Sequence, residues 1–195
     1  MKLRGIMVAA VVAVGWACTD QPKPATAGVV DSAISREEAL RRFRLDLPEV
    51  TSFSGGNRSR DGLVSDFLSA LERRDADTLR NLVISRAEFA YLYYPSSPQS
   101  LPPYDLSPDL MWFMHGLQGE EGIRHTLDAF GGRQFILVGY DCPLAPNRQD
   151  GNSVWAPCMV RWQDSAGVAS EGRLFGPIVE RDGIFKFVSY SSGRD

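Results

Sequence analysis

Apolar residues recur at helical spacing through the first half of the chain. The clearest stripe lies between residues 61 and 74, where the apolar positions are Leu63, Val64, Phe67, Leu68 and Leu71. This spacing places them on one side of an amphipathic helix. A shorter helix is expected over residues 35–44, because Ser35 and Glu38 have the spacing of a capping box.

Further helices are predicted from the same periodicity at residues 75–83, between Ser85 and Pro95, at 107–117 and at 120–130. The glycines around Gly116 and Gly119 are interpreted as a turn between the last two helices, since glycine lowers helix propensity. Residues 96–108 are rich in proline, which removes backbone donors, and are expected to form a surface excursion.

The second half of the chain changes to the alternating pattern of strands. Four strands are predicted at residues 134–142, 153–163, 168–179 and 184–190. The dipeptides Asp150-Gly151 and Asp182-Gly183 are typical of two-residue hairpin turns. Helices followed by such strands predict an α+β domain, with N-terminal helices packed on a C-terminal antiparallel meander of about four strands.

The first eighteen residues have the pattern of an export signal. Lys2 and Arg4 precede an uncharged, mostly apolar run of 13 residues that ends before Cys18. A membrane-spanning helix needs about 20 apolar residues, so this run is too short to cross a bilayer. The expected organisation is a signal peptide at 1–17, a flexible tether at 18–34 and a single α+β domain at 35–195.

The residues Gly15-Trp16-Ala17-Cys18 resemble the cleavage site of bacterial lipoproteins, in which a diacylglycerol is attached to the cysteine. Ala17 fits the small position of that motif, whereas Gly15 and Trp16 depart from it. The resemblance implies a lipid on Cys18, anchoring in the cell envelope and, because Thr19 follows, a location at the outer membrane. Ordinary cleavage and release is the alternative, since Ala25-Thr26-Ala27 also satisfies the small-x-small rule.

The chain contains three cysteines, and an odd cysteine in an exported protein needs an explanation. Lipidation of Cys18 leaves Cys142 and Cys158 as a pair. A hairpin centred on Asp150-Gly151 places Cys142 one position away from Cys158, and a bulge near Pro157 would bring the two into register. A disulfide is therefore expected, with two unpaired buried thiols as the alternative and no zinc site.

Two stretches resemble the nuclear transport factor 2-like superfamily, a cone-shaped α+β fold. They are Leu63–Leu82, a helix that breaks at an aspartate and re-enters a second helix, and Ile178–Tyr190, the final hairpin. The superfamily includes dehydratases, isomerases, carriers and dimerisation modules, so the resemblance implies a fold rather than a function. Its catalytic members hold Asp, His and Tyr inside the cone.

The loose counterparts of those catalytic residues are Tyr140, Asp141, Arg161 and Glu171. Strand alternation predicts Tyr140 inward, Asp141 outward and Arg161 on the face opposite Val160. These polar groups are not expected to converge, and no nucleophile elbow, phosphate loop or dinucleotide fingerprint is present in the sequence. No catalytic residue, metal or cofactor is predicted.

Aromatic residues flank the proline-rich segment and are interpreted as core with a rigid lid, or as the mouth of a ligand pocket. The candidate pocket residues are Trp112, His115, Tyr140, Arg161 and Glu171. The chain has 21 basic and 24 acidic residues, and loss of Lys2 and Arg4 with the signal changes its net charge from −3 to −5. This acidic balance argues against nucleic acid as a partner.

These observations predict an exported, lipid-anchored domain that binds a small apolar ligand or an envelope protein without catalysis. One alternative is an isomerase or dehydratase that uses the interior of the cone. Another is a soluble secreted domain or scaffold with no pocket.

Overall fold

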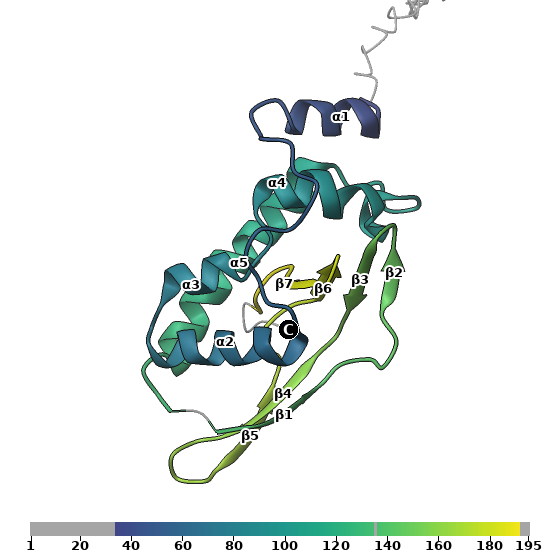
Figure 1. Ribbon diagram of the computed structural model, residues 1–195. Helices are drawn as coiled ribbons and strands as arrows, with labels where there is room; N and C mark the ends of the chain where they lie inside the picture. Colours follow the sequence, from purple (N-terminus) through teal and green to yellow (C-terminus); the bar gives the residue numbers. More distant parts are fainter. Residues whose placement is uncertain (1–33, 135, 192–195) are drawn as a thin grey trace, which may run out of the picture. The chain divides into compact units, whose positions relative to one another are not determined.

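Helices fill the first half of the chain and antiparallel strands the second half in the computed structural model, which describes residues 34–134 and 136–191 (Figure 1). The predicted α+β class, with helices N-terminal to the sheets, is confirmed. The predicted signal peptide, Cys18 and nearly all of the predicted tether lie outside the described residues.

The helices are α1 (Arg36–Phe43), α2 (Arg60–Glu72), α3 (Ala76–Asn81), α4 (Arg86–Glu88) and α5 (Pro108–Phe130), with a π-helix η1 (Phe89–Tyr93) and 3-10 turns η2 (Tyr94–Ser96) and η3 (Pro98–Ser100) between the last two. Each of these α-helices begins after a Ser or Asp whose side chain accepts a hydrogen bond from the backbone N–H three residues on. The capping residues are Ser35, Ser59, Asp75, Ser85 and Ser107. Local capping thus explains where each helix starts.

Helix α5 is continuous across the glycines at which a turn was predicted, so that prediction is wrong. A Cβ added to Gly122 would lie only 2.7 Å from the Cβ of Tyr190. The missing side chain therefore lets the helix pack closely against the end of the chain, and this tertiary contact outweighs the low helix propensity of glycine.

The proline-rich segment is only partly a surface excursion. Ser97 and Ser100 are fully buried, and the Ser100 hydroxyl donates to the carbonyl of Tyr94 at 2.7 Å. Residues 101–105 are exposed, as predicted for the whole segment.

In the described part of the chain, seven strands form two antiparallel sheets (Figure 1). One sheet has the order β1-β4-β5 and comprises Ile136–Asp141, Met159–Gln163 and Ala169–Gly172. The other has the order β2-β3-β6-β7 and comprises Asn147–Gln149, Asn152–Trp155, Ile178–Arg181 and Ile184–Phe187.

Two of the four predicted strands are interrupted near prolines, and β2 forms in a segment for which no strand was predicted. Pro157 lies between β3 and β4, and Pro177 lies just before β6. A proline has no backbone N–H to donate, so a sheet ladder rarely continues through it. The two hairpin turns at Asp150-Gly151 and Asp182-Gly183 are confirmed, with positive φ at all four residues.

The disulfide between Cys142 and Cys158 is present, with 4.3 Å between the two Cα atoms. Gln149 pairs with Asn152 in the β2–β3 ladder, whereas Asp141 pairs with Met159 in the β1–β4 ladder. The β1–β4 register is displaced by one residue relative to the β2–β3 register. The irregularity predicted near Pro157 was expected to produce this displacement. It brings the two cysteines opposite each other.

Candidate functional site

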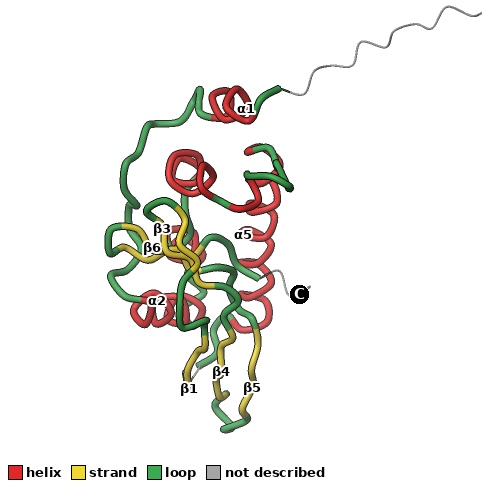
Figure 2. Tube along the Cα trace, turned by 90° about the vertical axis from the view of Figure 1, so that its right-hand side faces the viewer, coloured by secondary structure: helices red, strands yellow, loops and turns green. Residues whose placement is uncertain are grey.

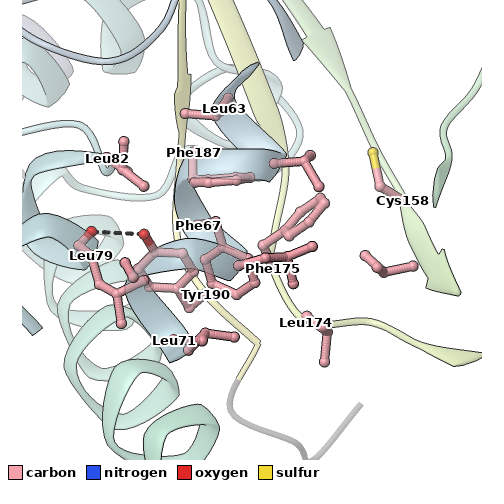
Figure 3. Packing of buried hydrophobic residues seen from close by; sticks show 14 of the residues in the cluster. Leu63, Phe67, Leu71, Leu79, Leu82, Cys158, Leu174, Phe175, Phe187 and Tyr190 are labelled. Carbon is pink, nitrogen blue, oxygen red and sulfur yellow. Dashed lines mark hydrogen bonds between the residues drawn. The ribbon is translucent and has the colours of Figure 1, made fainter. Parts of the chain in front are cut away.

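The space between helix α2 and the strands is filled by aromatic and leucine side chains (Figure 3). The ring of Phe67 stacks on Tyr190 at 5.3 Å and meets Phe187 edge-on at 5.6 Å. The Tyr190 hydroxyl donates to the carbonyl of Leu79 at 2.7 Å, and burial raises its pKa well above 10. The Tyr190 hydroxyl is therefore engaged inside this packed region.

An apolar groove lies instead between α5 and the segment that follows α3, and we call it the α5 groove. Its volume is about 200 Å³. Its walls are Val83, Ile84 and Val188 on one side and Trp112, His115, Gly116 and Gly119 on the other. Arg80 and Glu120 also line it and form an ion pair at 3.0 Å.

Two glycines keep the α5 groove open. A Cβ added to Gly116 or to Gly119 would meet no atom within 4 Å, in contrast to one added to Gly122. These three glycines recur every third residue. Gly116 and Gly119 leave free volume in the groove, whereas Gly122 permits close packing against Tyr190. Sequence reasoning missed Gly116 and Gly119 because it assigned them to a turn.

His115 is held among aromatic rings by the π-helix η1. Its ring centroid lies 5.6 Å from that of Phe89 and 6.1 Å from that of Tyr93. The π-helix presents both rings to the same imidazole, an irregularity that is frequent at functional sites. Trp112 adds a further ring 5.3 Å from Phe89.

The His115 imidazole is neutral near pH 7, because burial lowers its pKa to about 4. Its Nδ1 atom is buried and has no hydrogen-bond partner among the described residues. A buried N–H without an acceptor is costly, so we assign the proton to Nε2 and a lone pair to Nδ1. The α5 groove is therefore lined by apolar walls and by a neutral imidazole whose Nδ1 atom is shielded from solvent.

The other candidate pocket residues lie elsewhere. The Tyr140 hydroxyl donates to Asp61 at 2.7 Å, beside the edge of β1, and burial with the nearby carboxylate raises its pKa to about 12. Arg161 is opposite Glu171 in the β4–β5 ladder and forms an ion pair with Asp141. Trp112 and His115 share the α5 groove, but the structure does not bring Tyr140, Arg161 and Glu171 to it.

Within residues 34–134 and 136–191, no three His, Cys, Asp or Glu side chains are grouped so that they could hold a metal ion. No helix of this described part has the length and apolarity that crossing a membrane requires. No protein-family model, curated protein or solved structure matches the chain.

Proposed function

We propose that this chain is an exported, lipid-anchored domain of the cell envelope that binds a small planar apolar ligand in the α5 groove without chemical turnover. The observation that carries the proposal is the contrast between two regions. The space beneath the sheet is filled by Phe67, Phe187 and Tyr190, whereas Gly116 and Gly119 leave the α5 groove open.

The ligand class follows from the lining of the groove. Val83, Ile84 and Val188 offer apolar surface, and Trp112 offers a flat ring against which another ring can pack. A volume of about 200 Å³ suits one or two fused rings. The neutral His115 ring adds a further flat surface to this lining.

Export is supported by the disulfide between Cys142 and Cys158, because such bonds persist mainly in oxidising compartments. A fold of nuclear transport factor 2-like shape is part of the proposal. It is supported by the succession of α2 and α3 across Asp75 and by the terminal β6–β7 hairpin. The lipid on Cys18 accounts for the third cysteine, and two or more acyl chains would anchor the domain stably.

Ligand binding is tested by calorimetric titration with indole and 1-methylindole as probes. Indole has the ring size that the groove suits, and 1-methylindole adds one methyl group to the same ring system. We expect saturable binding of both probes and its loss in Gly119→Leu, whose side chain would occupy the groove. Saturable binding that survives Gly119→Leu would place the ligand elsewhere and overturn the assignment.

The anchor is tested by intact mass spectrometry of the membrane fraction from the host, with Cys18→Ser as the matched variant. A lipid adduct that disappears in Cys18→Ser is the expected result. A mature chain that begins at Gly28 and is freely released would contradict the anchor and leave the groove proposal intact.

A further inference from the structure

The exposed side of α5 changes character halfway along the helix. In the first half Leu110, Phe113 and Met114 are exposed, with 45%, 62% and 45% of their surface accessible. In the second half the exposed positions are Glu120, Arg124, His125 and Asp128. A surface helix is normally polar along its whole outer side. An exposed apolar patch such as that of the first half marks a contact surface.

The three apolar side chains share one side of the helix, which we call the α5 outer face. Positions i, i+3 and i+4 of a helix are neighbours, with about 5–6 Å between their Cβ atoms. Met111 and Trp112 lie on the inner side instead, because Met111 is buried in the core and Trp112 lines the α5 groove. The fold itself therefore does not use the α5 outer face.

The α5 outer face lies at the end of the domain to which the N-terminal segment connects. Figure 2 shows α1 and one end of α5 at one end of the domain, with β1, β4 and β5 at the opposite end. Phe43 of α1 belongs to the same core cluster as Met111, so this is the N-terminal end of α5. Ile34, just before α1, lies 16 positions after Cys18. A segment of this length spans at most about 58 Å, so a lipid on Cys18 would hold this end of the domain near the bilayer.

We propose that the α5 outer face docks on the lipid bilayer to which Cys18 is attached, and this docking rests on the anchor of the proposed function. Phe and Leu are typical of apolar faces that enter the boundary between headgroups and acyl chains. Tyr104, in the loop that leads into α5, is exposed and is of a residue type enriched at the headgroup level. The acyl chains supply the stable attachment, and the α5 outer face fixes how the domain is oriented on the membrane.

The charges near this face favour an uncharged bilayer surface. Residues 104–119 contain no Lys or Arg, and their charged residues are Asp105 and Asp109. Asp109 lines a cleft together with Arg42 and Arg86, so it need not enter the bilayer. Anionic headgroups attract basic segments, and none is present here. The contact is therefore one of apolar burial, on zwitterionic lipid.

Docking is tested by spin labelling of the lipid-anchored full chain in phosphatidylcholine vesicles. Met114→Cys places the label on the α5 outer face, and His125→Cys, on the polar half of the same helix, is the matched control. The lipid blocks Cys18 and the disulfide blocks Cys142, so the label attaches to the introduced thiol. In vesicles we expect the Met114→Cys label to lose access to a water-soluble nickel complex and to gain access to oxygen. The His125→Cys label should stay accessible to the nickel complex.

The outcomes separate the docking from the anchor. If the protein floats with the vesicles but both labels are equally accessible to the nickel complex, the docking is wrong and the anchor stands. If the protein does not float with the vesicles, both are wrong. Dipolar coupling between Met114→Cys labels, removed by dilution with unlabelled chain, would show a second copy on the face and would also overturn the docking.

A charge introduced on the face provides a second test. Phe113→Glu should restore access of the nickel complex to the Met114→Cys label with an unchanged circular dichroism spectrum, whereas Arg124→Glu, on the polar half, should leave the label protected. Equal effects of the two substitutions would contradict the docking. Added phosphatidylglycerol, which is anionic, should not strengthen the protection. Stronger protection would show an electrostatic contact and would overturn the proposal.

Discussion

Lys186 donates hydrogen bonds to both carboxylate oxygens of Glu88, at 2.9 and 3.2 Å, and both side chains are almost fully buried. The carboxylate also accepts the backbone N–H groups of Ser54 and Ser85, each at 2.6 Å. Lys186 completes the network by donating to the carbonyl of Ser54 at 2.9 Å. The pair thus joins β7, α4 and the loop before α2, immediately beside two walls of the α5 groove.

Removal of one partner of this pair should destabilise the fold strongly. Lys186→Met leaves the Glu88 carboxylate buried without its counter-charge, and the free energy of unfolding should fall by about 3–5 kcal/mol. Arg41→Met is the control, because Arg41 pairs with Glu38 in solvent and an exposed pair of this kind contributes far less to stability. Guanidinium unfolding measures both. Equal losses in the two variants would show that burial of the pair has no special effect.

The disulfide should contribute measurably to stability. In the chain-entropy treatment, a bond that closes a loop of this length stabilises by about 3 kcal/mol, and the two cysteines are 16 residues apart. The double variant Cys142→Ala, Cys158→Ala should unfold at a lower denaturant concentration, with a free energy of unfolding lower by about 3 kcal/mol. Added reductant should lower the stability of the parent chain and leave the double variant unchanged. A parent chain that is indifferent to reductant would contradict the prediction.

Acid should destabilise the fold through His115. Burial lowers the pKa of this imidazole from 6.5 to about 4, so the unfolded chain takes up the proton first as the pH falls. The stabilising contribution of the neutral ring is fully present above pH 6.5 and is lost as the pH falls towards 4, by up to about 3 kcal/mol.

Urea unfolding at pH 7 and pH 4.5 checks this dependence. Between these pH values the parent chain should lose more stability than His115→Phe, which has no titrating ring. His125→Phe removes the other histidine, which is exposed, and should behave like the parent chain. If His115→Phe and the parent chain lose equal stability, burial does not lower the pKa of His115 and the prediction is wrong.

The glycines of α5 should respond in opposite directions to the same substitution. Gly119→Ala adds a methyl group where no atom lies within 4 Å, so the helix should gain up to about 1 kcal/mol. Gly122→Ala forces a methyl group against Tyr190, and overpacking of this kind costs about 1–3 kcal/mol. Thermal unfolding of the two variants measures the contrast. Stabilisation by both would mean that α5 does not pack against Tyr190.

Local signals in the sequence were sufficient for the elements that local chemistry determines. The Ser and Asp caps set the helix starts at Ser35, Asp75 and Ser107, and the Asp-Gly dipeptides set both hairpin turns. The disulfide also followed from local information, because the turn position and the irregularity near Pro157 together gave the register.

The parts that depend on distant contacts could not be obtained in the same way. Gly122 is helical because Tyr190 packs against it from 68 positions further along the chain, and no local pattern records that contact. Likewise, strand alternation correctly predicted that Tyr140 lies on the same face of the sheet as the buried Val160. It also predicted Ile136 and Val138 on that face. The register shift at Val138 breaks that grouping and leaves both residues exposed.

The candidate site was predicted only in part for the same reason. Trp112 and His115 lie one helical turn apart on α5, so their shared surface follows from the sequence. Val83, Ile84 and Val188 complete the groove. They come from segments distant in the sequence, which meet through backbone hydrogen bonds from Ile84 to Phe187 at 3.0 Å and from Phe187 to Leu82 at 2.9 Å. Arg161 and Glu171 lie opposite each other in the β4–β5 ladder, and neither lines the α5 groove.

The binding role of the α5 groove is tested most directly by nuclear magnetic resonance spectra of the labelled protein during titration with indole. The account predicts saturable shifts of the Trp112 side-chain N–H, the His115 ring and the Val188 amide, all of which disappear in Gly119→Leu. Shifts confined to residues 137–144 beside β1, or an absence of saturable shifts, would contradict it.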